Sequence, residues 1–172
     1  MKMRPNIISN LLLFALMMPI FGQMFYPKHK STKKYYLITF KANWFKSLSH
    51  CRSIGMNLVS ITSKEENDRI AKLIVDAGHE TANFWTSGVR IDEVLWEWVG
   101  SGKQITFNNW TPGQPDNQNQ PYNTNKVETC VNVIGKNSYG DFQAQKWNDE
   151  NCFTEMYFIC EQDLIEYEYC TN

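Results

Sequence analysis

The sequence predicts an α+β fold, with two helices in its first half and several short strands in its second. Apolar residues recur with helical spacing up to Gly78. After Thr81, turn residues become frequent and short aromatic runs replace that spacing. The sequence contains no internal repeat, which argues against a solenoid. Helices followed by strands in a chain of 172 residues favour one α+β domain with short extensions.

The N-terminal segment has the order typical of a secretory signal peptide. Lys2 and Arg4 precede an uncharged apolar run from Leu11 to Phe21, and Gly22 follows. That run is shorter than the roughly 20 apolar residues of a membrane span. We therefore expect a secreted, extracellular protein. The chain then divides into a signal peptide, a basic N-terminal arm, a folded domain and an acidic tail, at residues 1–22, 23–34, 35–162 and 163–172.

Composition excludes several classes of protein. Hydrophobic residues make up 42% of the chain, enough to form a core, so wholesale disorder is excluded. The formal net charge of -1 argues against a nucleic-acid partner, which would require a basic excess. None of the three histidines (His29, His50 and His79) has the spacing of a catalytic triad to a serine or cysteine. We therefore expect no enzymatic activity.

The first half contains two strand and two helix signals. Tyr35–Phe40 is aromatic and β-branched, as in a strand, and Ala42–Ile54 has apolar residues at helical spacing before Gly55. Leu58–Ile61 is a second short strand candidate. Ser63 followed by Glu66 predicts a capping box, and hence a second helix that ends at Gly78.

The second half contains short strand signals around a long polar loop. The strand candidates are Phe84-Trp85, Leu95–Trp98 and Val131–Ile134, followed by a predicted final hairpin from Gln145–Asn148 and Met156–Cys160. The loop spans Asn108–Asn125 and is rich in Asn, Gln and Pro. Because such loops in compact domains are usually functional or disordered, we look for the functional site there.

Oxygen donors gather in and after this loop. They are Gln114, Asp116, Glu128, Asn148 and Asp149. Amide and carboxylate oxygens without His or thiolate suit Ca²⁺, which takes 6–8 oxygen ligands, and do not suit zinc. Taken alone, the same residues are more typical of a solvated polar loop, so the donor set by itself does not establish a calcium site.

The order of several motifs resembles a C-type lectin-like domain, from about Tyr35 to Glu161. The motifs are Phe84-Trp85-Thr86-Ser87-Gly88, Trp96-Glu97-Trp98, Asn109-Trp110, Gln114-Pro115-Asp116-Asn117, Glu128-Thr129-Cys130, Trp147-Asn148-Asp149 and Phe158-Ile159-Cys160-Glu161, with Cys51 and Cys152 at matching places. The resemblance implies two helices with small antiparallel sheets and a long calcium- and sugar-binding loop. It also implies the disulfides Cys51–Cys160 and Cys130–Cys152.

The resemblance also implies the ligand set of the family's principal calcium site. Gln114, Asp116, Glu128, Asn148 and Asp149 would bind Ca²⁺, with Asp149 giving its side chain and its backbone carbonyl. Six protein oxygens leave room for about two sugar hydroxyls in a sphere of 6–8. The same five residues would bind the carbohydrate, and binding of this kind breaks no bond. Asn117 and Thr129 stand where an auxiliary site often has acids, so we expect no second ion there.

Gln114-Pro115-Asp116 corresponds to the family's galactose-type motif, in which the Pro115 peptide would be cis. Tyr122 is the one aromatic residue between Asp116 and Glu128. It is either a stacking platform for the sugar or a turn residue packed on its neighbours, and both interpretations stay open. The sequence thus predicts a secreted, calcium-dependent, galactose-type carbohydrate-binding protein, with a role in innate recognition of microbial or cell-surface glycans. The alternative is a calcium-independent lectin-like protein that binds a protein partner, such as a toxin, receptor ligand or matrix component.

The two ends of the mature chain carry two further predictions. The four cysteines of the implied disulfides leave Cys170 unpaired near the C-terminus, where an oxidising compartment favours an intermolecular bond and a disulfide-linked homodimer. The basic arm (Lys28–Lys34) and the acidic stretch Glu161–Glu168 have opposite charge, so we expect a weak surface attraction between them.

Overall fold

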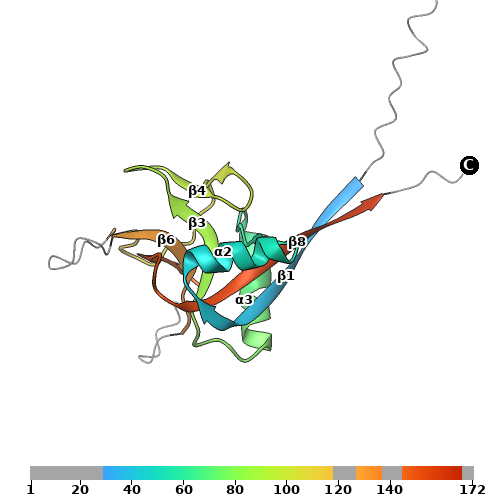
Figure 1. Ribbon diagram of the computed structural model, residues 1–172, viewed down its shortest axis with the longest axis horizontal. Helices are drawn as coiled ribbons and strands as arrows, with labels where there is room; N and C mark the ends of the chain where they lie inside the picture. Colours follow the sequence, from blue (N-terminus) through green and yellow to red (C-terminus); the bar gives the residue numbers. More distant parts are fainter. Residues whose placement is uncertain (1–28, 118–126, 137–144, 168–172) are drawn as a thin grey trace, which may run out of the picture. The chain divides into compact units, whose positions relative to one another are not determined.

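The computed structural model describes residues 29–117, 127–136 and 145–167 (Figure 1). One compact unit spans residues 32–164, and the described residues 29–31 and 165–167 belong to a second unit. The expected signal peptide, Tyr122 and Cys170 lie outside the described residues.

The elements follow the predicted order of helices first and strands later. The two helices are α2 (Trp44–Ser53) and α3 (Lys64–Asp76). The strands are β1 (His29–Ala42), β2 (Asn57–Leu58), β3 (Phe84–Arg90), β4 (Trp96–Trp98), β5 (Lys103–Gln104), β6 (Glu128–Val133), β7 (Trp147–Asn151) and β8 (Met156–Tyr167).

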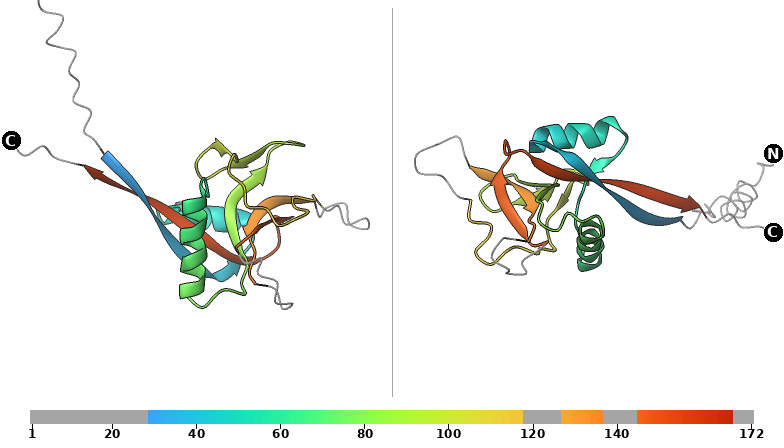
Figure 2. Two further views of the ribbon diagram at one scale, coloured as in Figure 1. Left: turned by 180° about the vertical axis from the view of Figure 1, so that it is seen from behind. Right: turned by 90° about the horizontal axis from the view of Figure 1, so that it is seen from below.

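Strand β8 lies between β1 and β3 in the sheet. It runs parallel to β3, with Phe84 opposite Tyr157, whereas β6 pairs antiparallel with both β3 and β7. Figure 2 shows α2 and α3 on opposite sides of the β1–β8 pair. This arrangement confirms the predicted α+β fold with two helices. The predicted small antiparallel sheets are instead one eight-stranded sheet among the described residues, and it contains the parallel pair β3–β8.

Helix α2 begins after Asn43, whose side chain bonds one of the free N–H groups in the first turn. The side chain of Asn43 accepts a hydrogen bond from the backbone N–H of Lys46 at 3.0 Å, as an N-cap does. The helix therefore starts at Trp44, two residues after the predicted start. It ends before Gly55, whose φ of +74° is the left-handed conformation that favours glycine.

The predicted capping box of α3 is half formed. The side chain of Ser63 accepts from the backbone N–H of Glu66 at 3.2 Å, as predicted. The Glu66 carboxylate, however, accepts from the backbone N–H and the hydroxyl of Thr62, at 2.6 and 2.7 Å. Glu66 thus fixes the position of Thr62, the residue before the N-cap, and with it the segment that leads into α3.

Several sequence predictions for strands differ from the structure, and Leu58–Ile61 is one of them, because β2 covers only Asn57–Leu58. The first strand begins at His29, six residues before the predicted Tyr35. The predicted final hairpin is wrong, because β7 pairs with β6 and β8 pairs with β1, β2 and β3. Buried residues on β6 and β7 face the same core, so β6 is the better partner: Val133 lies opposite Trp147.

Three tryptophans and two disulfides hold the core together. Trp85, Trp98 and Trp147 are among the largest fully buried side chains. The ring of Trp147 meets those of Trp98 and Trp110 edge to face, and this arrangement favours aromatic pairs. Both disulfides implied by the resemblance are present. Cys51–Cys160 joins α2 to β8, and Cys130–Cys152 joins β6 to the residue that follows β7.

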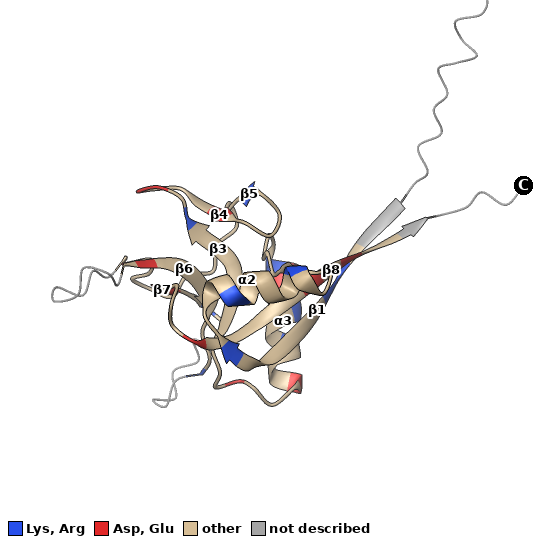
Figure 3. Cartoon of the chain, viewed as in Figure 1, with Lys and Arg blue, Asp and Glu red and all other residues tan. Residues whose placement is uncertain are grey.

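Charged residues of both signs are distributed over the helices and strands. Figure 3 shows Lys and Arg positions interspersed with Asp and Glu positions over the described part of the chain. The acidic residues of the long loop and of β6 and β7 are the exception, because they converge on one point.

Candidate metal centre

Three carboxylates that are distant in the sequence meet at this point. Asp116, Glu128 and Asp149 each have an oxygen within 4.8 Å of the other two. Asp116 lies in the loop after β5, Glu128 begins β6, and Asp149 lies in the middle of β7. Antiparallel pairing of β6 with β7 brings the last two together, and the loop then folds over them.

Asp149 holds the loop that contains Asp116 and Asn117 in place. It is fully buried, and its two carboxylate oxygens accept hydrogen bonds from the backbone N–H groups of Asp116 and Asn117, at 3.2 and 2.9 Å. Burial raises the pKa of the Asp149 carboxyl above its ordinary value, although these N–H donors oppose the shift. Strand β7 therefore carries one candidate ligand, Asp149, and through Asp149 it also fixes the loop that carries a second candidate, Asp116.

The two amide residues predicted for the site contact the same cluster. The Gln114 Oε1 atom accepts from the backbone N–H of Asp116 at 2.9 Å, and its Nε2 atom donates to the Asp116 carboxylate at 3.3 Å. The Gln114–Pro115 peptide is cis, as the resemblance implied. The Asn148 side-chain nitrogen donates to the backbone carbonyl of Asp149. The structure thus brings all five predicted ligand residues into one neighbourhood.

The crowding of carboxylates has an electrostatic cost. The pKa of Glu128 is raised to about 7, first by burial and then by the nearby carboxylates of Glu150 and Asp149. A cation placed among these groups would remove the repulsion that raises this pKa. Hard carboxylate and amide oxygens suit calcium, so the residues fit the ion that the family implies.

Sequence reasoning missed two residues beside the site. One is Glu150, which follows the predicted Asp149 and contributes to the pKa of Glu128. The other is Arg90 at the end of β3, whose guanidinium donates to the Asn117 Oδ1 atom at 2.6 Å. The contact joins residues 27 positions apart, and no short motif could have signalled it.

The expected absence of an auxiliary site rested on Asn117 and Thr129. Asn117 is engaged by Arg90, and the hydroxyl of Thr129 lies 3.1 Å from the sulfur of Cys152. Asp92, another acid that could have served an auxiliary site, caps a turn: its carboxylate accepts from the backbone N–H groups of Val94 and Leu95, at 2.9 and 2.8 Å. Those bonds lower the pKa of Asp92.

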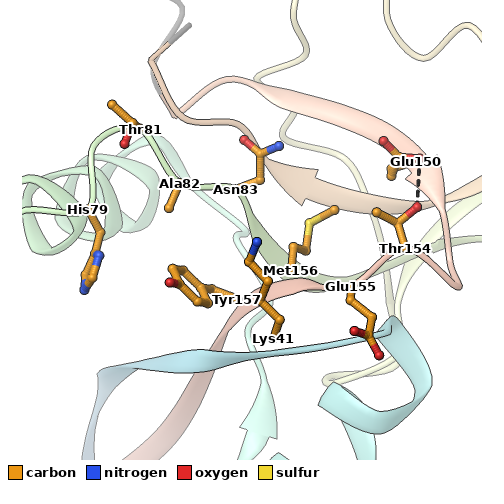
Figure 4. Close-up of a pocket in the computed structure, with 10 residues that line it drawn as sticks. All are labelled: Lys41, His79, Thr81, Ala82, Asn83, Glu150, Thr154, Glu155, Met156 and Tyr157. Carbon is orange, nitrogen blue, oxygen red and sulfur yellow. Dashed lines mark hydrogen bonds between the residues drawn. The ribbon is translucent and has the colours of Figure 1, made fainter.

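A separate open cavity of about 440 Å³ lies beside β7 and β8 (Figure 4). Its lining residues are Lys41, His79, Thr81, Ala82, Asn83, Glu150, Thr154, Glu155, Met156 and Tyr157. The Thr154 hydroxyl donates to the Glu150 carboxylate at 3.2 Å, and the rings of His79 and Tyr157 pack edge to face. None of the five predicted ligand residues lines this cavity, so it is distinct from the acidic cluster.

Comparison with known proteins identifies the family. The model of the lectin C-type domain matches residues 40–162. The C-type lectin mosGCTL-7 of Aedes aegypti is 31% identical over 134 residues, which cover 76% of this chain and 83% of the relative. The mouse scavenger receptor C-type lectin carbohydrate-recognition domain has a TM-score of 0.64 and 27% identity, over 83% of this chain and 98% of that domain.

The same fold also occurs without calcium. A calcium-independent type II antifreeze protein has a TM-score of 0.59 and 19% identity over 76% of this chain, a likeness that shows the fold alone. Among the described residues, no helix is long and apolar enough to cross a membrane. The match over residues 40–162, together with the predicted fold and disulfides, shows that the chain belongs to the C-type lectin family of non-enzymatic carbohydrate-binding proteins.

Proposed function

We propose that this chain is a secreted, calcium-dependent carbohydrate-binding protein that prefers galactose-type sugars. The observation that carries the proposal is the convergence of Asp116, Glu128 and Asp149 within 4.8 Å. Gln114 donates to the Asp116 carboxylate, and Asn148 donates to the backbone carbonyl of Asp149. Bringing three carboxylates together costs electrostatic repulsion, which raises the pKa of Glu128. A bound cation makes this arrangement favourable.

The chain's own residues would prepare the metal site and then read the sugar. Asp149 holds the loop through two backbone N–H groups, so the carboxylates are positioned before the ion arrives. Calcium would supply open coordination positions for two neighbouring sugar hydroxyls. Amide groups both donate and accept, and carboxylates accept, so Gln114 and Asn148 can bond the same hydroxyls as Glu128.

The galactose preference rests on the order of groups in Gln114-Pro115-Asp116. In the resembled family, this order places the amide before the acid, whereas Glu-Pro-Asn is typical of mannose-type members. Exchanging the amide and the carboxylate changes where a sugar hydroxyl finds a hydrogen-bond donor and where it finds an acceptor. Specificity is the resulting difference in affinity between sugars whose hydroxyls are arranged differently. Tyr122 is our proposed stacking residue, and it lies outside the described residues.

Retention on sugar resins tests the proposal. We expect retention on immobilised galactose, weaker retention on mannose, and complete elution from both by a calcium chelator. Retention on galactose that survives the chelator would contradict the calcium mechanism. Equal retention on both sugars would contradict the galactose preference alone.

Substitution of Asp149 tests the site assignment. Asp149→Ala removes a buried carboxylate and should abolish retention. Asp149→Asn keeps an acceptor for one of the two loop N–H groups and should disturb the fold less than alanine, yet bind calcium much more weakly. Asp68→Asn is a matched control, because Asp68 is an exposed acid on α3. An Asp149→Asn protein that binds sugar as well as the control would remove Asp149 from the site.

The second candidate function is calcium-independent binding of a protein partner, with this chain acting as a toxin, a receptor ligand or a matrix component. The calcium-independent antifreeze protein supports this alternative, since it shows that the fold persists without the ion. Failure to bind either resin, together with no heat on calcium titration, would favour it.

A disulfide-linked homodimer through Cys170 is a further part of the proposal. The two disulfides of the described domain use the other four cysteines, and Cys170 lies outside the described residues. Two linked sites would bind arrayed microbial or cell-surface glycans with greater avidity than one. A non-reducing gel of the secreted protein should show a dimer that disappears in Cys170→Ser. A monomer only would exclude the dimer and leave the sugar site unaffected.

A further inference from the structure

Arg90 lies outside the predicted ligand set but is joined to it by two hydrogen bonds. Its guanidinium donates to the Asn117 Oδ1 atom at 2.6 Å, and the backbone N–H of Asn117 donates to the Asp149 carboxylate at 2.9 Å. Asn117 has a φ of +51°, the left-handed conformation in which asparagine is tolerated better than most residues. Through its side chain and its backbone N–H, Asn117 therefore connects Arg90 at the end of β3 to the buried acid on β7.

We propose that Arg90 is a positioning residue that holds the Gln114–Asn117 segment closed over Asp149 before calcium binds. This inference rests on the proposed calcium site. The bond to a charged donor fixes the Asn117 side chain, and that in turn fixes the N–H group aimed at Asp149. Without Arg90, the segment must be ordered when calcium binds, and the free energy of ordering is subtracted from the binding free energy.

The alternative role for Arg90 is purely electrostatic, and it predicts the opposite sign. A positive charge beside a cation site repels calcium, so removing that charge alone should tighten calcium binding. The positioning role predicts weaker binding after the same substitution. A single calcium titration therefore separates the two roles.

The experiment combines two substitutions in a double-mutant cycle. Arg90→Gln removes the charged donor, and Asn117→Gly removes the acceptor while keeping a residue suited to a positive φ. Arg52→Gln is a matched control, since Arg52 is exposed at the end of α2 and its loss changes the net charge equally. Calcium is titrated calorimetrically into all variants after removal of metal, and circular dichroism checks that each folds.

We expect Arg90→Gln to raise the calcium dissociation constant about tenfold, the lower end of the effect of residues that orient metal ligands. Asn117→Gly should have a similar effect, and the double variant should lose no more than either single variant. Tighter calcium binding in Arg90→Gln, or additive losses in the double variant, would overturn the proposal.

Hydrogen exchange in the calcium-free protein supplies a readout that does not depend on the metal. The amides of Asp116 and Asn117 should exchange faster in Arg90→Gln and Asn117→Gly than in the unchanged chain and Arg52→Gln. Unchanged exchange would contradict the positioning role. If the unchanged chain binds no calcium, the proposed function fails, whereas the exchange rates still decide the role of Arg90.

Discussion

The ammonium nitrogen of Lys33 lies 3.0 Å from a carboxylate oxygen of Glu161, and this ion pair joins β1 to β8. The same nitrogen lies 3.0 Å from Glu66 on α3 and donates to the backbone carbonyl of Ser60 at 3.1 Å. The Glu161 side chain is 4% exposed, and burial raises its pKa even with Lys33 beside it. The attraction predicted between the arm and the acidic stretch therefore includes a largely buried pair, where a weak surface effect was expected.

Replacing Lys33 should destabilise the fold. The Glu161 oxygen that faces Lys33 is buried, and the Lys33 ammonium compensates its charge, so Lys33→Met leaves that carboxylate without its ion-pair partner. Loss of one partner of a fully buried pair costs about 3–5 kcal/mol. Because the Lys33 side chain is 20% exposed, we expect a loss of about 2 kcal/mol in the free energy of unfolding.

Urea denaturation measures this effect, with Lys72→Met as the matched control. Lys72 pairs with Asp76 on the exposed face of α3, and such pairs contribute only about 0.5 kcal/mol. Equal midpoints for the two variants would show that the Lys33 cluster does not stabilise the fold.

Calcium affinity should depend on pH near neutrality. The pKa of Glu128 in the metal-free fold is raised to about 7, mainly by burial and then by neighbouring carboxylates. Because Glu128 binds a proton more tightly in the folded than in the unfolded protein, its protonation stabilises the fold. This stabilisation is complete at pH values below the pKa of Glu128 in the unfolded chain, and it is lost as pH rises through about 7. Calcium binds only the ionised Glu128 carboxylate, so the affinity of the protein for calcium should increase as pH rises from about 6 towards about 8. Below the pKa of Glu128, the increase should be up to about tenfold per pH unit.

Calcium titrations at several pH values test this dependence. Glu150→Gln should move its midpoint to lower pH, because the largest charge contribution to the raised pKa of Glu128 is then absent. An affinity that is constant from pH 6 to 8 would contradict the raised pKa.

The sequon Asn109-Trp110-Thr111 should carry no glycan. The Asn109 Nδ2 atom, which a glycan would modify, donates to the backbone carbonyl of Gln145 at 2.9 Å, and its Oδ1 atom accepts from Lys146 at 2.7 Å. The Thr111 hydroxyl is buried. Mass spectrometry of the protein secreted from a eukaryotic host should find the Asn109 peptide unmodified, and a glycosylated peptide in the folded protein would show that these contacts are not needed.

Local patterns predicted the parts of the molecule that local chemistry determines. Ser63 caps α3 and Gly55 ends α2 because each satisfies backbone requirements within a few residues. Family resemblance supplied the disulfides and the ligand set, which no spacing rule could choose. The predicted hairpin failed because strand pairing depends on which faces share a core, and that is decided by residues far apart, such as Val133 and Trp147.

In the candidate site, too, the sequence predicts what residue type determines and not what the fold determines. The oxygen donors could be read from the sequence, because their chemistry is carried by residue type. Arg90 and Glu150 could not be assigned, since their roles depend on distances that only the fold creates. The pKa of Glu128 is likewise a property of the assembled cluster, as burial and three neighbouring carboxylates produce it together.

The most direct test of calcium-dependent sugar binding is the calcium dissociation constant measured with and without saturating galactose. If sugar hydroxyls complete the ion's coordination, the two ligands must tighten each other's binding by the same factor. We predict a lower calcium dissociation constant in galactose, and a smaller decrease in mannose. A calcium dissociation constant that galactose leaves unchanged would contradict the account.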